Sequence, residues 1–159
     1  MIVGEPGGEA TARLATVVDV LDGAGVDVTA SHAIRRDIWY KLWGNMTINP
    51  IAALCRVTAD RILDQPLTEA LVRKIMGEAQ QIGKAIGCDI AEDAAARNAV
   101  TRSLGAFRPS MLQDVEAGRS MEVDALLGAP REIAQQLGIA TPFIDALLGM
   151  MRLLDERHA

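Results

Sequence analysis

The chain has 159 residues, which is enough for one domain with its own hydrophobic core. Half of the residues are apolar and only 3% are aromatic, a composition that favours packed helices over sheets. The formal net charge of -5 argues against a nucleic-acid partner, because such proteins contact phosphates through clustered Lys and Arg.

The sequence lacks the features that mark several other classes of protein and site. No apolar run approaches the roughly 18 residues of a membrane span, and the N-terminus has no secretory signal, so a cytoplasmic protein is predicted. Cys55 and Cys88 lack CxxC spacing, which predicts free, mostly buried thiols. His32 and His158 are too far apart in the chain to suggest a zinc site or a Ser-His-Asp triad.

The first half of the chain begins with an extended segment and continues with helices. Residues 1–8 contain glycines and a proline, as expected of a linker or of the remnant of a preceding domain. Apolar residues recur at helical spacing over residues 9–22. A long apolar helix follows over residues 38–54, with Asp37 placed to cap or open it. Pro50 lacks an N–H group and predicts a kink in the preceding turn.

The second half reads as a series of shorter helices. They are predicted over residues 67–86, 92–104, 123–137 and 142–154, with a further helix that has Pro109 in its first turn. Gly25, Gly87 and Gly138 are each followed by an apolar residue, the pattern of a glycine-terminated helix. The prediction is an all-α protein in which residues 9–159 form one helical domain.

A polar stripe crosses the long apolar helix. Lys41, Asn45 and Asn49 recur every fourth residue, and at about 100° per residue they share one face. An ammonium and two carboxamides in such apolar company point to a binding site, because buried polar groups need partners. The structural alternative is that Lys41 reaches water while the two amides flank the proline kink.

A second group of polar residues lies around a glycine. Ser110 and Asp114 share a helix face, and Glu122 could return to that side if Gly118 only bends the path. The structural alternative makes Ser110 an ordinary first-turn residue, Asp114 a helix N-terminal residue, and Glu122 part of a solvated acidic pair. If both groups converge, a lysine can give up a proton while a carboxylate adjusts its pKa.

Four stretches carry a resemblance to a known family. They are Trp39–Leu54, Arg108–Asp114, Gly118–Gly128 and Gly138–Pro142. Together they resemble the C-terminal helical domain of ketopantoate reductases (2-dehydropantoate 2-reductases). The resemblance implies a multi-helix bundle like that of 6-phosphogluconate dehydrogenase-like proteins.

The resemblance also implies a reaction and two catalytic residues. The family reduces ketopantoate to pantoate with NADPH, in the pathway to pantothenate. Carried over, Lys41 is the general acid that protonates the carbonyl oxygen, and Glu122 is the carboxylate that orients it. The chemistry agrees, since a positioned ammonium stabilises the negative charge that develops on that oxygen.

The remaining polar residues are implied to bind the 2-keto acid. Asn45 and Asn49 contact the substrate or hold the lysine, while Ser110 and Asp114 bind its carboxylate or hydroxyl end. A homodimer is a further expectation, because apolar surface left by an absent domain can be covered by a second copy.

The sequence departs from the family in its N-terminal half. It contains no GxGxxG turn between a strand and a helix, so NADPH is expected on a missing Rossmann domain and not on this chain. This chain alone is therefore expected to be inactive. The alternative function is a non-catalytic helical module for dimerisation or for binding a small carboxylate.

Overall fold

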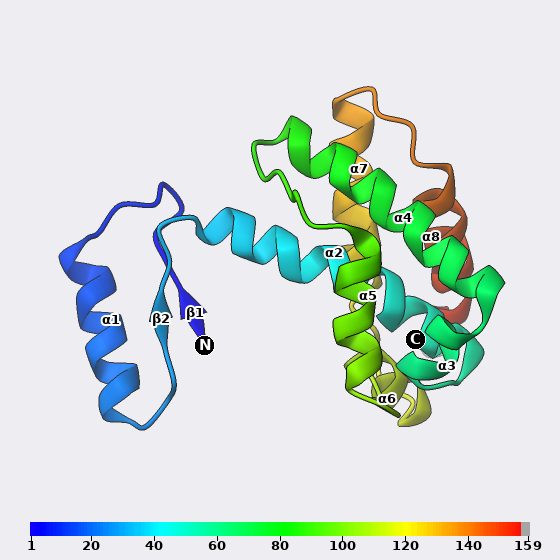
Figure 1. Ribbon diagram of the computed structural model, residues 1–159, viewed down its shortest axis with the longest axis horizontal. Helices are drawn as coiled ribbons and strands as arrows, with labels where there is room; N and C mark the ends of the chain where they lie inside the picture. Colours follow the sequence, from blue (N-terminus) through cyan, green and yellow to red (C-terminus); the bar gives the residue numbers. More distant parts are fainter. Residues whose placement is uncertain (157–159) are drawn as a thin grey trace. The chain divides into compact units, whose positions relative to one another are not determined.

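Residues 1–156 of the computed structural model are described, and they belong to two compact units. The first unit covers Met1–Lys41 and the second covers Leu42–Ala159. The described part of the chain contains eight α-helices, one π-helical turn and two short strands (Figure 1). The predicted all-α class is confirmed, and the strand pair is confined to the first unit.

A strand, a helix and a second strand build the first unit. β1 (Ile2–Val3) and β2 (Thr29–Ala30) pair in parallel, and α1 (Ala12–Gly23) connects them and packs against β2. The Thr11 hydroxyl caps α1 by accepting a hydrogen bond from the Leu14 backbone N–H at 3.1 Å. The helix predicted in this region is confirmed, with a slightly later start.

The long helix α2 spans Ile34–Cys55 and begins earlier than predicted. Asp37 lies inside its first turn, where it accepts a hydrogen bond from the Ser31 hydroxyl. That hydroxyl also accepts from the Ala33 backbone N–H at 3.0 Å, so Ser31 is the residue that turns the chain into the helix. Pro50 lies within α2, and its predicted kink stays a prediction.

The part of α2 that belongs to the second unit is deeply buried. Its buried residues are Trp43, Gly44, Met46, Thr47, Ile48, Asn49, Pro50, Ile51, Ala52 and Ala53. The Trp43 indole N–H donates a hydrogen bond of 3.0 Å to the Met76 carbonyl of α4 (Pro66–Ala85). A fully buried aromatic side chain thus anchors α2 to another helix of the core.

The rest of the second unit is arranged around α4 (Figure 1). Its other elements are α3 (Ala59–Asp64), α5 (Ala94–Ser103), α6 (Ser110–Glu116), η1 (Asp124–Gly128), α7 (Ala129–Gln136) and α8 (Pro142–Asp155). Helix α4 packs against α3, α5, α7 and α8, and its apolar face supplies much of the core.

The three predicted glycine endings are confirmed. Gly25, Gly87 and Gly138 have φ values of 77°, 76° and 68°, in the left-handed region that favours glycine. After Gly87, the Cys88 backbone N–H donates to the Gly83 carbonyl at 2.7 Å, and after Gly138 the equivalent bond measures 2.9 Å. These bonds satisfy carbonyls that the helix end would leave unpaired.

Two segments differ from their predictions. The helix predicted over residues 123–137 is present as a continuous helical segment, but it opens with a π-helical turn, η1, before α7. The short helix α3 was not predicted, and the Ala59 N–H at its start donates 3.0 Å to the distant Phe107 carbonyl. Both segments depend on tertiary contacts, which the local pattern of apolar residues does not contain.

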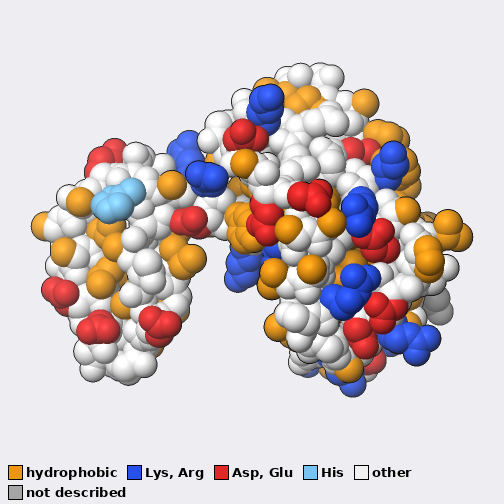
Figure 2. Space-filling model, in the orientation of Figure 1, with side chains coloured by type: hydrophobic (Ala, Val, Ile, Leu, Met, Phe, Trp, Pro, Cys, Tyr) orange, Lys and Arg blue, Asp and Glu red, His pale blue; other side chains and the backbone are white. Residues whose placement is uncertain are grey.

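The surface carries mixed charge and one unexpected thiol. On the face drawn in Figure 2, acidic and basic side chains are interspersed over the second unit.

Both cysteines are free, as predicted, but only Cys88 is buried; Cys55 is exposed because it ends α2. None of the helices in residues 1–156 is both long and apolar enough to cross a membrane.

Candidate functional site

The predicted polar stripe lies on α2 and becomes more buried along the helix. Lys41, the last residue of the first unit, is exposed. In the second unit, Asn45 is half-buried and Asn49 is 8% exposed. Their four-residue spacing places them on one face of a continuous helix, as predicted.

The two amides on this helix lack protein partners. Neither Asn45 nor Asn49 forms a side-chain hydrogen bond with another residue of 1–156, so neither amide acts as a cap beside Pro50. The amide atoms of both residues keep some contact with solvent, because neither residue is among those with buried, unpartnered polar atoms. Both amides are therefore open to a ligand, and their role in binding one stays a prediction.

Ser110 and Asp114 lie one turn apart on α6. Ser110 is exposed at the first position of the helix, and Asp114 is half-buried. Asp114 has a local partner, because Oδ1 accepts hydrogen bonds from Arg119 Nε at 2.9 Å and Nη2 at 2.7 Å. Arg119 was not predicted from the sequence. It lies five residues after Asp114 and just after Gly118, where the chain can turn back toward the Asp114 carboxylate.

Glu122 is exposed immediately before the segment that contains η1. Contacts with α8 hold this segment on both sides of the glutamate. The Met121 N–H donates 3.2 Å to Asp155 Oδ1, and Arg152 Nη2 donates 2.7 Å to Asp124 Oδ1. π-helical turns are often found at functional sites.

The structure describes Lys41 and Glu122 in separate units. Both side chains are exposed to solvent. A proton donor and its carboxylate partner must be exposed in this way for a substrate to reach them. Their pairing, on which the predicted chemistry depends, stays a prediction.

One contact between α2 and a charged side chain was not predicted from the sequence. Arg97 of α5 is half-buried, and its guanidinium lies against the backbone of α2 at Gly44, the residue before Asn45. A methyl group added at Gly44 would lie 2.9 Å from Arg97 Nη2. The only available signal was a glycine inside an apolar helix, which often marks a close approach by another group.

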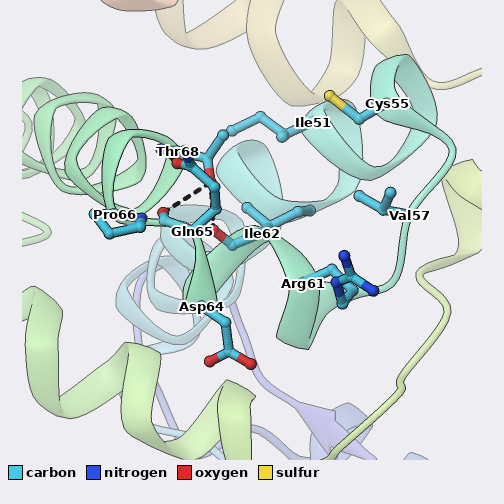
Figure 3. A pocket seen from close by; sticks show the side chains of 9 residues that line it. All are labelled: Ile51, Cys55, Val57, Arg61, Ile62, Asp64, Gln65, Pro66 and Thr68. Carbon is cyan, nitrogen blue, oxygen red and sulfur yellow. Dashed lines mark hydrogen bonds between the residues drawn. The ribbon is translucent and has the colours of Figure 1, made fainter.

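A separate groove opens at the C-terminal end of α2 (Figure 3). It has a volume of about 460 Å³, and Figure 3 shows that α2, α3 and the start of α4 supply its walls. Its lining residues are Ile51, Cys55, Val57, Arg61, Ile62, Asp64, Gln65, Pro66 and Thr68. None of the six predicted site residues lines this groove, so it is distinct from the candidate site.

Comparisons with known proteins point in one direction. A protein-family model described as the ketopantoate reductase PanE/ApbA C terminal matches residues 33–155. The 2-dehydropantoate 2-reductase of Mesorhizobium japonicum is 40% identical over 152 residues, covering 96% of this chain and 47% of that protein. The chain spans about half the length of the curated relatives it matches.

Solved structures agree with the sequence relatives. A candidate ketopantoate reductase from Ralstonia solanacearum has a TM-score of 0.93 and 49% identity, over 98% of this chain and 47% of that one. The 2-dehydropantoate 2-reductase from Methylococcus capsulatus has a TM-score of 0.91 and 29% identity, over 99% of this chain and 51% of that one.

Proposed function

Because the chain belongs to the ketopantoate reductase PanE/ApbA C-terminal family, we propose that it is the substrate-side domain of a 2-dehydropantoate 2-reductase-like oxidoreductase. The reaction is the NADPH-dependent reduction of ketopantoate, a small 2-keto acid, to pantoate in the cytoplasm. In this proposal residues 1–8 link the helical domain, 9–159, to a nucleotide-binding domain.

The observation that carries the proposal is the pair of amides on α2 without protein partners. Asn45 and Asn49 offer donors and acceptors from a buried helix, one and two turns beyond the ammonium of Lys41. When the keto carbon is reduced, negative charge develops on its oxygen. Lys41 stabilises that charge and donates the proton, while Glu122 orients the ammonium.

Ser110 and Asp114 contact the other end of the substrate. The Ser110 hydroxyl is exposed and can donate to a carboxylate or a hydroxyl group. Asp114 is paired with Arg119 and acts as an acceptor, which suits a substrate hydroxyl better than a carboxylate.

The first unit does not provide a nucleotide site of its own. A phosphate-binding loop between a strand and a helix presents free backbone N–H groups at the helix N-terminus. Here the Glu5 carboxylate is buried in the loop between β1 and α1, where it accepts hydrogen bonds from Thr11 and Arg13, and Thr11 already caps α1. The nucleotide is therefore assigned to the part of the relatives that this chain does not match.

The decisive experiment joins this chain to the unmatched half of the Mesorhizobium japonicum relative and follows NADPH oxidation with ketopantoate. Lys41→Ala should lower kcat by about 100- to 10,000-fold, the usual contribution of a positioned general acid, and Glu122→Gln should lower it in the same direction. Lys74→Ala, at an exposed position of α4, is the matched control and should keep full activity.

Equal activity of the Lys41 and Lys74 variants would remove the catalytic assignment. A joined protein that folds but shows no ketopantoate-dependent oxidation would remove the proposed reaction and leave the small-carboxylate-binding or dimerisation module.

A homodimer is the proposed assembly. Val100, Leu104 and Phe107, on α5 and the loop after it, are large apolar residues that are 55%, 59% and 46% exposed. Such side chains gain by burial against a second copy. Sedimentation of the chain as a monomer over the micromolar range would contradict this assembly.

A further inference from the structure

Glu122 lies at the start of a helical segment, and its carboxylate is exposed. The chain is helical from Val123 onward, and the Glu122 carbonyl accepts the first bond of that helix from the Leu126 N–H at 3.1 Å. Among residues 1–156, no group forms a hydrogen bond or an ion pair with the Glu122 carboxylate. The direction in which this side chain projects is therefore determined by the backbone that carries it.

The backbone before Glu122 is irregular. Residues 119–122 form neither helix nor strand, so their N–H groups need partners outside regular structure. The Met121 N–H has a distant one, because it donates a hydrogen bond of 3.2 Å to Oδ1 of Asp155 in α8. The Val123 N–H donates 2.8 Å to the Met121 carbonyl. Glu122 is thus held between an anchored residue and the first turn of a helix.

The side chains of this segment alternate between the core and the solvent. Met121 is 7% exposed and Val123 is 3% exposed, whereas Glu122 between them is exposed. Turning the backbone here would bury the charge of Glu122 and expose apolar side chains, and both changes cost free energy. The anchored backbone therefore keeps the carboxylate directed outward.

Two polar contacts connect this segment to α8 beside an open space. A cavity of about 300 Å³ is lined by Val123, Asp124, Arg152, Asp155 and Glu156. The pair of Asp124 with Arg152 is largely exposed, with side chains 78% and 56% accessible, so water weakens it. The bond from the Met121 N–H to Asp155 is partly buried and has a charged acceptor, which makes it the stronger contact.

We propose that Asp155 is a positioning residue for Glu122. The proposal rests on the proposed function, in which Glu122 orients the ammonium of Lys41. Asp155 acts through the Met121 backbone and not on the substrate. Because Glu122 supports the group that meets the charge developing during reduction, loss of Asp155 lowers kcat and leaves KM unchanged.

The first test follows amide hydrogen exchange in the complete 159-residue chain. Asp155→Ala removes the acceptor, so the Met121 N–H should exchange about tenfold faster. Asp155→Asn keeps a carbonyl oxygen in the same place and should retain most of the protection. Glu156→Ala, at the next and exposed position, is the matched control and should exchange at the wild-type rate. Unchanged exchange at Met121 in Asp155→Ala would overturn the anchoring role.

The second test is a double-mutant cycle on kcat in the joined enzyme. Asp155→Ala should lower kcat by up to about 100-fold, the loss that a misplaced reacting group can cause, with KM unchanged. In the Glu122→Ala background the same substitution should cause no further loss, because no carboxylate remains to be positioned. Asp155→Asn should restore most of kcat, since its amide oxygen can accept the same hydrogen bond.

The outcomes separate this inference from the proposed function. If the joined enzyme is inactive, or if Glu122→Ala leaves kcat unchanged, both are overturned. If Glu122→Ala lowers kcat and Asp155→Ala lowers it equally in both backgrounds, Asp155 only stabilises the fold and this inference alone is overturned. A raised KM with unchanged kcat for Asp155→Ala also contradicts it. A loss of kcat confined to the enzyme that retains Glu122 supports it.

Discussion

A buried carboxylate on α4 determines where the last helix begins. Glu78 is 7% exposed and accepts hydrogen bonds from the backbone N–H groups of Phe143, at 3.0 Å, and Ile144, at 2.9 Å. These are first-turn donors of α8, which have no partners within the helix. The side chain of Thr141, at the capping position, does not cap the helix and bonds to Asp145 instead. Glu78 therefore replaces the local cap and joins α4 to α8.

Replacing Glu78 should destabilise the protein without altering the candidate site. Glu78→Gln removes the charge and leaves one of the two N–H groups facing an amide N–H, which should lower the free energy of unfolding by about 1–3 kcal/mol. Glu69→Gln on the same helix breaks only an exposed pair with Arg73 and should cost less than about 0.5 kcal/mol. Urea unfolding of both variants checks this, and equal costs would contradict the capping role.

At the scale of a single helix, a feature could be predicted from the sequence when its physical cause lies within the helix or at its end. The endings at Gly87 and Gly138 were predictable because a left-handed residue is a local requirement that glycine meets. The π-helical turn was not, because Asp124 is held by Arg152 of α8, and Gly128 leaves room for the Asp124 carboxylate. That carboxylate lies 2.8 Å from where a Cβ of Gly128 would be.

The same distinction applies to the candidate site. The stripe of Lys41, Asn45 and Asn49 follows from the period of one helix, so its presence on one face of α2 was predictable. The contact of Arg97 with Gly44 depends on which helix packs there, and no spacing within either helix contains that information.

Two glycines, one inside α4 and one just beyond its end, should respond to alanine with opposite signs. Gly87 has φ 76° just beyond the helix, so Gly87→Ala places a Cβ in a strained conformation and should cost about 1–2 kcal/mol. Gly77 lies inside α4 with open space around its Cα, so Gly77→Ala should stabilise the protein by up to about 1 kcal/mol. Thermal unfolding should lower the Tm of the first variant and raise that of the second. A shift of the same sign in both would show that packing, and not backbone conformation, dominates at one of them.

At the scale of the whole molecule, the two units differ in how much they bury. In the first unit the buried residues are Glu5, Leu14, Ser31 and Trp39, whereas the second buries most of the apolar side chains of the protein. Stability rises with the apolar area removed from water, so the first unit should open at lower denaturant concentration than the second. Polar contacts then carry a larger share of its stability.

The first unit should therefore be the part of the molecule that responds to mild acid. The hydrogen bond from Arg13, with a further one from Thr11, lowers the pKa of Glu5 below its ordinary value of 4.5. The folded unit binds fewer protons than the unfolded chain in this range, so its stabilisation is complete above pH 4.5 and declines as the pH falls below that value. Resonances of α1 in a urea titration, repeated from neutral pH down to acid, report this decline. Glu5→Gln should weaken the unit at neutral pH and flatten the pH dependence. Glu9→Gln, at an exposed position of the same loop, should retain the wild-type profile, and an identical profile for both variants would contradict the role of Glu5.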